Sequence, residues 1–247
     1  MKRKIKCILN IILITIIVLS LFACDICTHS SYADWNVSVS FGRDTRSCID
    51  CGVTETRLTK EIGETGEAGG IIYYRNVNGF TVQASPSGYT PAWTAYTAYY
   101  LEAAPEDMAT QFRWSTLSID EFSASGYDIS LLIDISGTRT EIGTGKRNTA
   151  VILELDATAP AALACKNYNV TGYESFNDWF LPSKSELDAM YIAKEAPNNV
   201  VGLQTTNAIW SSSQSNINTA WGPDFQEGVS QGFAKYFEHY VRAVRAF

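Results

Sequence analysis

The chain has 247 residues, 46% of them hydrophobic, which is enough to bury one good core in a single domain. Its 26 acidic and 19 basic residues give a net charge of −7. Because so acidic a protein repels phosphate backbones, we exclude nucleic acid from the expected partners.

The first 23 residues have the pattern of a secretory signal peptide. Four basic residues in MKRKIK precede an apolar run from Cys7 to Ala23. The run leads into Leu-Phe-Ala-Cys, which resembles the bacterial lipobox, in which the cysteine is acylated. We therefore expect lipidation of Cys24 and a lipoprotein anchored to a membrane of the bacterial cell envelope, at the surface or in the periplasm. The alternatives are an uncleaved anchor helix, whose run is short against the roughly 20 residues of a span, and cleavage without lipid after Ala33.

Residues 24–62 are polar, and this composition predicts a surface tether. Within the segment, residues 35–41 alternate between apolar and polar, which suits either a short half-buried strand or a disordered stretch.

Four cysteines follow the lipidation site, and three of them lie in the tether. Cys48 and Cys51 form a Cys-x-x-Cys motif, which suits a local disulfide, because thiols outside the cytoplasm tend to pair; the alternative is a flexible pair with no special role. The same pair with Cys27 and His29 would supply four zinc ligands, but the segment has no second Cys-x-x-Cys, so we expect no metal. Cys165 lies among alanines on a predicted helix, where a small buried residue is expected.

We expect a folded domain over residues 63–247. It opens with two β-branched and aromatic runs, at 69–75 and 80–84. The pair Asn78-Gly79 between them favours positive φ angles and predicts a tight hairpin turn.

The middle of the domain is mixed. Residues 99–105 predict a strand, and 108–147 an irregular insertion with one further strand at 129–135. A helix over 148–168 follows, which Pro160 should break or kink. The segment GTGKRNT before it lacks the Ser or Thr that follows the lysine of a phosphate loop, so we interpret it as a turn with Asn148 or Thr149 as the helix cap.

The segment DWFLPSKSELDAMY, residues 178–191, predicts the second helix. Ser183 and Glu186 have the spacing of a capping box, and Leu187, Met190 and Tyr191 recur at helical spacing. We interpret this segment as structural; the alternative is an aromatic site that stacks on sugars. After residue 202 the pattern has period two and predicts short strands, so the chain is α+β.

Seven motifs occur in order from Gly69 to Phe247: GGIIYY, YLEAAP, GKRNT, AALAC, DWFLPSKSELDAMY, IWSSS and VRAVRAF. Together they resemble the Lcl C-terminal domain family, which is typified by the C-terminal domain of a collagen-like adhesin. The resemblance implies a C-type-lectin-like fold with mixed, mainly antiparallel sheets, two helices and a long irregular loop region that carries the ligand surface. It also implies that the N- and C-terminal strands pair at the base.

We find no pattern for catalysis. A Ser-His-Asp set requires a histidine base, and the two histidines are His29 in the tether and His239 near the C-terminus. We therefore expect a protein that is not an enzyme and has no cofactor.

The late segment combines aromatic with small polar residues, as adaptable recognition surfaces do. By analogy with the resembled family, we expect an exposed ligand-binding patch; the other late aromatics should face the core. Its candidate residues are Gln214, Asn216, Asn218, Trp221, Tyr236 and His239.

These features predict a lipid-anchored bacterial surface protein whose lectin-like domain serves adhesion by binding an extracellular protein or glycan. The resemblance suggests sulfated glycans as one ligand class, which the acidic chain disfavours. The alternatives are a structural component of the envelope without a small ligand and an extracellular enzyme.

Overall fold

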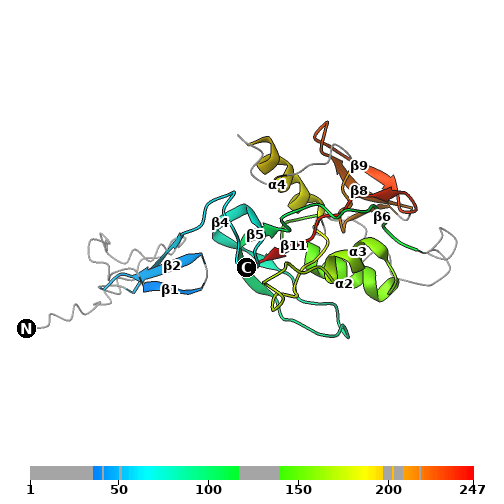
Figure 1. Cartoon of the computed structure of the whole chain (residues 1–247). Helices are drawn as coiled ribbons and strands as arrows, with labels where there is room; N and C mark the ends of the chain where they lie inside the picture. The colour runs from blue at the N-terminus through cyan, green and yellow to red at the C-terminus, as the bar shows by residue number, and fades with distance from the viewer. Residues whose placement is uncertain are drawn as a thin grey trace, which may run out of the picture.

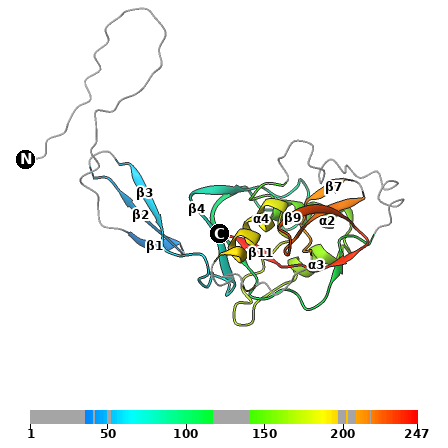
Figure 2. The same ribbon diagram turned by 90° about the horizontal axis from the view of Figure 1, so that it is seen from above.

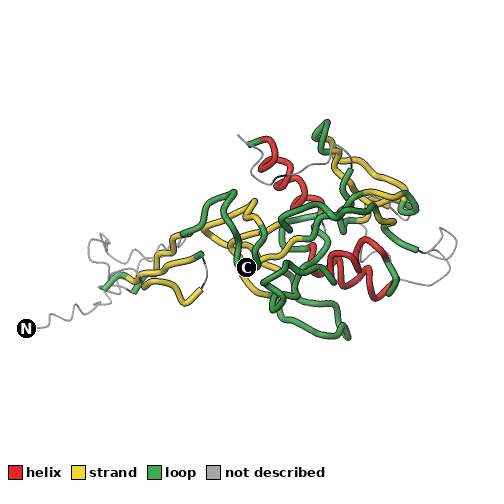
Figure 3. The backbone as a smooth tube through the Cα atoms, in the orientation of Figure 1, coloured by secondary structure: helices red, strands yellow, loops and turns green. Residues whose placement is uncertain are grey.

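The computed structural model describes residues 36–40, 42–49, 52–116, 140–196, 202, 208–216 and 218–247. This part of the chain is a mixed α+β structure with three helices and four small antiparallel sheets (Figure 1). Much of the chain between these elements is loop or turn (Figure 3). The strands are β1 (Asn36–Ser40), β2 (Arg43–Ser47), β3 (Thr54–Leu58), β4 (Ile71–Val82), β5 (Tyr96–Ala103), β6 (Phe112–Arg113), β7 (Gln214–Asn216), β8 (Thr219–Asp224), β9 (Val229–Ala234), β10 (Glu238–His239) and β11 (Val244–Ala246). The helices are α2 (Gly145–Leu155), α3 (Pro160–Lys166) and α4 (Lys184–Glu195).

The central sheet has the strand order β11-β5-β4 and joins the end of the chain to the start of the domain. Val244 of β11 pairs with Ala103 at the end of β5, and both are fully buried. On its other side, the backbone of Val244 exchanges two hydrogen bonds with Phe180, at 2.8 and 3.0 Å. The closing strand therefore lies between β5 and the segment that leads into α4 (Figure 2).

The predicted hairpin at Asn78-Gly79 is wrong. β4 continues through both residues as one strand and pairs with β5 on either side of them. The register shifts between Arg75 and Phe80, and Gly79 there has a φ of +73°. The positive φ that Asn-Gly favours is thus used for an irregularity inside a long strand, not for a chain reversal.

The predicted break at Pro160 is confirmed, since α2 ends before it and α3 begins with it. The predicted cap of the first helix is wrong: α2 begins at Gly145, and Asn148 and Thr149 lie inside it. The Thr149 hydroxyl instead donates to the Gly145 carbonyl at 2.8 Å. The insertion is described only at its two ends, and the strand predicted at 129–135 lies outside the described residues.

The capping box of α4 is confirmed. The Glu186 amide donates to Ser183 Oγ at 3.3 Å, and the Ser183 amide donates to Glu186 Oε2 at 2.7 Å. The Glu186 carboxyl also accepts from the Gly143 amide at 2.8 Å, so the helix start is tied to the start of α2. Burial raises the pKa of Glu186 to about 7, against the opposing effect of these amides. Leu187 and Met190 are fully buried, as their spacing predicts.

Three consecutive aromatic and aliphatic residues of the DWFLP segment divide between two core clusters. Trp179 and Leu181 pack in the cluster beneath α2 and α3, whereas Phe180 packs in the cluster between α4 and the central sheet. Such alternation is what an extended segment between two layers produces. Each cluster therefore depends on this segment, which contributes core residues to both, as the structural interpretation predicts.

Part of the segment predicted to be a tether is folded. β1, within the predicted stretch 35–41, forms a three-stranded sheet with β2 and β3. This small sheet projects beside the rest of the described chain (Figures 1 and 2). The Tyr100 hydroxyl joins it to the central sheet, donating to the Gly42 carbonyl at 2.5 Å and accepting from the Lys60 amide at 3.2 Å.

Several predictions for the N-terminal region concern residues that the structure does not describe. The proposed disulfide is one of them, because Cys48 is described and buried but Cys51 is not. Cys24, Cys27 and His29 also lie outside the described residues. Among the described residues, no helix has the length and hydropathy of a membrane span.

A buried ion-pair network surrounds Arg245 on β11, whose exposed fraction is 4%. Its guanidinium donates to Asp178 at 2.9 Å, to Glu67 at 3.1 Å and to Glu102 at 3.2 Å. Glu102 is fully buried and also accepts from the amide of Gly70 at 2.6 Å. One side chain therefore connects the closing strand with β5, with the turn before β4 and with the DWFLP segment.

We expect the substitution Arg245→Met to lower the free energy of unfolding by about 3–5 kcal/mol, because it leaves the fully buried carboxylate of Glu102 without its cation. Urea unfolding followed by circular dichroism measures this loss. Arg113→Met is the matched control: Arg113 and Glu238 are more than half exposed, so losing their contact should cost less than about 1 kcal/mol. Equal losses in the two variants would show that the network does not hold the strand.

Candidate functional site

The sheet β7-β8-β9 gathers the predicted ligand-binding residues. Gln214 and Asn216 lie on β7, Asn218 in the turn after it and Trp221 on β8. The other two predicted residues, Tyr236 and His239, follow β9, which pairs with β8 along its whole length. Tyr236 lies in the turn after β9, and His239 lies on β10, which pairs with β6 in a separate two-stranded sheet. The predicted residues, up to 25 positions apart in the sequence, therefore come from two neighbouring sheets and the turns beside them (Figure 1).

Gln214 is fully buried, so its predicted place in an exposed patch is wrong. Its Oε1 accepts a hydrogen bond from Lys235 Nζ at 2.6 Å, and this ammonium group lies 4.6 Å from the ring centre of Trp114. Burial lowers the pKa of Lys235 to about 7. A neutral amide is a suitable acceptor for a buried amine, and this pairing explains why Gln214 faces inward.

Asn216 is exposed, as predicted, but its side chain has a local structural task. Its Oδ1 accepts from the amides of Asn218 at 2.9 Å and Thr219 at 3.0 Å. These bonds fix the turn between β7 and β8 in the manner of an Asx turn.

Trp221 is half-buried on β8, and Lys184 Nζ lies 5.7 Å from its ring centre. Lys184 is at the start of α4, so this contact joins the sheet to the DWFLP segment's helix. The predicted patch is therefore partly core, with Trp221 at its border.

Polar atoms without a partner concentrate in this region. Among the described residues, buried side-chain atoms without a hydrogen bond include Gln214 Nε2, Asn218 Oδ1, Trp221 Nε1 and His239 Nε2. Buried polar atoms are normally paired, and exceptions gather where a ligand or a water completes the bonding. All four belong to residues that the sequence selects.

Among the described residues, the two most exposed aromatic side chains lie in the turn between β9 and β10. Tyr236 is 54% exposed and Phe237 49%, and their ring centres are 4.7 Å apart in an edge-to-face arrangement. The Phe237 amide donates to the Ala234 carbonyl at 2.9 Å, which fixes the turn. Sequence reasoning selected Tyr236 and missed Phe237, although the adjacent pair Tyr-Phe between polar residues was the signal for both.

His239 lies behind this pair in an aromatic environment. Its ring centre is 4.5 Å from that of Phe233 and 4.7 Å from that of Trp210. Burial lowers the pKa of His239 because it disfavours the charged imidazolium. Glu238 is directed to Arg113 instead, at 3.9 Å, so this carboxylate does not orient the imidazole as a catalytic base would require.

Other candidates for chemistry are also structural in the described part of the chain. Cys165 is a free, fully buried thiol whose pKa burial raises, which makes it a poor nucleophile. The described residues contain no group of three or more His, Cys, Asp and Glu that could hold a metal ion.

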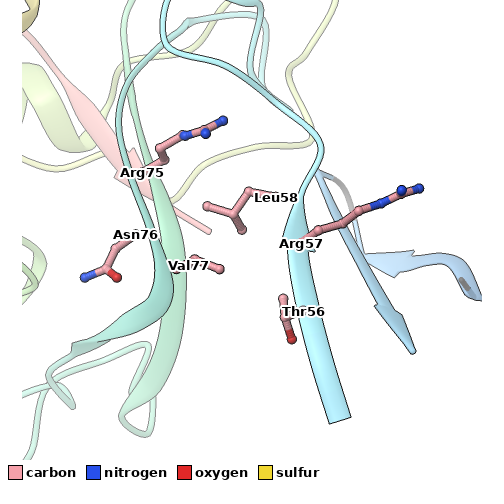
Figure 4. Close-up of a pocket in the computed structure, with 6 residues that line it drawn as sticks. All are labelled: Thr56, Arg57, Leu58, Arg75, Asn76 and Val77. Carbon is pink, nitrogen blue, oxygen red and sulfur yellow. The ribbon is translucent and has the colours of Figure 1, made fainter. Parts of the chain in front are cut away.

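A hollow of about 560 Å³ separates β3 from β4 (Figure 4). Leu58 and Val77 line it together with Arg57 and Arg75. Both cations already have carboxylate partners: Arg57 pairs with Asp44 at 2.8 Å, and Arg75 pairs with Glu61. The hollow therefore offers little uncompensated charge to a ligand, and we assign it no binding role.

Comparison with known proteins identifies a family. Residues 93–245, more than half of the chain, match the model of the Lcl C-terminal domain. Among solved structures, the chain is similar to the crystal structure of a fimbrial protein from Bacteroides ovatus ATCC 8483, with 14% sequence identity and a TM-score of 0.44. The match covers 83% of this chain and 57% of that one, and a TM-score this low establishes no common fold. No curated protein matches the chain.

We expect His239 to titrate with a pKa below the ordinary value of about 6.5, because its surroundings are apolar. Nuclear magnetic resonance of the imidazole protons over a pH series measures this pKa. The variant His239→Gln assigns the signal, since the chain has only two histidines. A pKa at or above the ordinary value would mean that the imidazole is hydrated or paired with a carboxylate.

Proposed function

The chain belongs to the Lcl C-terminal domain family, and on this basis we propose that it is a bacterial surface protein whose domain serves adhesion. In this proposal a lipid on Cys24 anchors the chain to the membrane of the cell envelope. The domain, of C-type-lectin-like fold over residues 63–247, then presents a binding surface to an extracellular protein or glycan.

The observation that carries the proposal is the exposed pair Tyr236 and Phe237. Two large aromatic side chains about half exposed and in contact with each other are costly to leave in water and are what recognition surfaces use. Their turn is held by β10, where His239 pairs with Phe112 of β6. A rigid presentation lowers the entropy lost on binding, so the pair is suited to act as an anchor.

The sheet behind the pair supports the same assignment. Unpartnered polar atoms of Asn218, Trp221 and His239 lie near the border of the exposed surface. A surface that combines aromatic anchors with unsatisfied donors and acceptors fits binding of a polar partner better than it fits a purely structural contact.

The C-type-lectin-like fold is part of this proposal, and one feature supports it: the first long strand of the domain, β4, and the last strand, β11, belong to the same sheet. The family resemblance implies that the terminal strands pair directly, and this detail is wrong, because β5 lies between them.

We also propose that the domain is not an enzyme. This rests on the aromatic surroundings of His239 and on the burial of the Cys165 thiol. A nucleophile at work needs access to a substrate, which the buried Cys165 thiol lacks, and a histidine base needs an orienting carboxylate, whereas Glu238 is directed to Arg113.

Replacing both anchors, Tyr236→Ser with Phe237→Ser, should weaken adherence to the natural target at least about tenfold, because buried aromatic anchors each contribute about 2 kcal/mol or more. The measurement is adherence of cells that display the chain, together with binding of the purified chain to glycan and protein arrays.

The matched control is Ile192→Ser on α4, which removes a side chain that is 70% exposed and should not change adherence. Unchanged adherence of the double variant would exclude this surface. If the unmodified chain binds to no array and no target, the alternative function, a structural component of the envelope, is favoured.

The substitution Cys24→Ser should move the chain from the detergent phase to the aqueous phase in a phase-partition experiment on whole cells. The reason is that the acyl chains, at about 0.8 kcal/mol per buried methylene, supply the membrane affinity. A variant that stays in the detergent phase would indicate an uncleaved anchor helix instead of a lipid. Unmodified chain found in the aqueous phase would indicate cleavage without lipid.

A further inference from the structure

A second hollow, of about 210 Å³, lies on a part of the domain that the predicted patch does not include. The loop between β4 and β5 supplies one wall, and the first turn of α2, the end of α3 and the start of the DWFLP segment supply the others. Its chemically informative lining residues are Tyr89, Trp93, Lys146, Lys166, Asp178 and Trp179.

Trp93 lies in a loop, but hydrogen bonds of both its backbone and its side chain fix its position. Its Nε1 donates to the Gln83 carbonyl at 2.8 Å, and its amide donates to Ser85 Oγ at 3.1 Å. Its carbonyl accepts from the Ser85 amide at 3.1 Å. The Tyr89 ring contacts it edge to face, with ring centres 5.6 Å apart. The two rings therefore form a preorganised aromatic wall.

Two lysines flank this wall. Lys146 Nζ lies 5.0 Å from the ring centre of Trp93 and 3.4 Å from the hydroxyl of Tyr96. Lys166 Nζ lies 5.5 Å from the ring centre of Tyr89. The pKa of Lys146 is below its ordinary value. Burial is the main cause, the charge of Asp178 opposes it, and the charge of Arg245 adds to it.

The lining of the hollow contains two lysines and one carboxylate, that of Asp178. Asp178 accepts two hydrogen bonds from the guanidinium of Arg245, at 2.9 and 3.3 Å, and shares this cation with Glu67 and Glu102. The lining therefore carries one more positive than negative charge, in a chain whose net charge is −7. A locally positive site on an otherwise negative protein favours a negatively charged ligand.

Trp179 adds an unsatisfied donor. Trp179 is one of the residues that line the hollow, its exposed fraction is only 3%, and its Nε1 has no hydrogen-bond partner within the described part of the chain. A buried indole N–H normally finds a partner, and an oxygen of a bound molecule would supply one.

We propose that this hollow binds a single sugar unit that carries a carboxylate. The aromatic wall fits the apolar C–H surface of a sugar ring, and Lys146 and Lys166 fit its carboxylate. Asn177, an exposed amide at the rim, and Asp178 offer partners for hydroxyl groups. The volume lies below the roughly 300–1,000 Å³ of pockets for larger ligands, which suits one ring.

The same charges argue against an extended polyanion. Two lysines around one carboxylate make a compact cationic site, and the acidic remainder of the chain repels a long anionic ligand. A terminal acidic sugar places one charge in the hollow and leaves its other side to solvent.

The test uses the full chain, purified in detergent, with glucuronic acid and N-acetylneuraminic acid as acidic probes and glucose as the neutral probe. Ligand-observed nuclear magnetic resonance detects binding at dissociation constants up to about 10 mM, which is weak on the affinity scale. We expect at least one acid to bind and glucose to bind at least about tenfold more weakly, a difference of about 1.4 kcal/mol.

Substitutions locate the site. Trp93→Ala should abolish the signal of the acid, and Lys146→Gln should weaken binding of the acid without changing that of glucose. Lys194→Gln is the matched control, because this lysine lies at the end of α4 and does not line the hollow. Unchanged thermal midpoints for all three variants exclude loss of the fold as the cause.

Three outcomes overturn the proposal: neither acid binds, glucose binds as tightly as the acid, or Lys146→Gln binds the acid as the unmodified chain does. These outcomes leave the Tyr236–Phe237 surface untouched, because that surface is tested by adherence and by different variants. Conversely, loss of the adherence function would leave the sugar titration unaffected.

Discussion

The contact between Arg245 and its three carboxylates is the constraint on which the rest of the domain depends. A guanidinium that is almost fully buried requires nearby anions, and Asp178, Glu67 and Glu102 each come from a different segment. Burial raises the pKa of Glu102, an effect that the Gly70 amide and then Arg245 oppose. The guanidinium and the carboxylate of Glu102 thus compensate each other's burial, and the last strand is tied to three other segments at once.

This constraint also determines what the DWFLP segment presents to solvent. The bond from Arg245 fixes Asp178, and the backbone bonds between Phe180 and Val244 fix the next turn of the chain. Trp179, between them, is therefore held with its ring in the core, while its Nε1 stays unpartnered. The segment is structural by its packing, and the same packing creates one wall of the hollow beside Trp93. A structural and a binding role are not alternatives for these residues.

The domain presents two surfaces of different chemistry. The Tyr236–Phe237 pair is a protruding aromatic surface on a small sheet, whereas the hollow beside Trp93 is concave and cationic. Both are preorganised by backbone hydrogen bonds, at the Ala234–Phe237 turn and at the Ser85–Trp93 contact. Protruding aromatics suit a broad partner, and a small charged hollow suits one ring of a glycan. A surface protein with both would combine adhesion with selectivity for the chemical group that it touches.

The sequence by itself determined the features that depend on neighbouring residues. The capping box at Ser183 and Glu186, the break at Pro160, the burial of Leu187 and Met190 and the family match all follow from local spacing and motif order. Only the tertiary structure decided which side of an element faces solvent and what lies across from it. Gln214 faces inward because Lys235, 21 residues away, needs an acceptor, and Gly79 serves a strand irregularity because β5 pairs on both sides of it. The hollow was invisible in the sequence because Trp93, Lys146 and Trp179 come from three segments. Only the folding of the chain around Arg245 and the two cores brings them together, since pairing over long separations depends on packing and not on any local pattern.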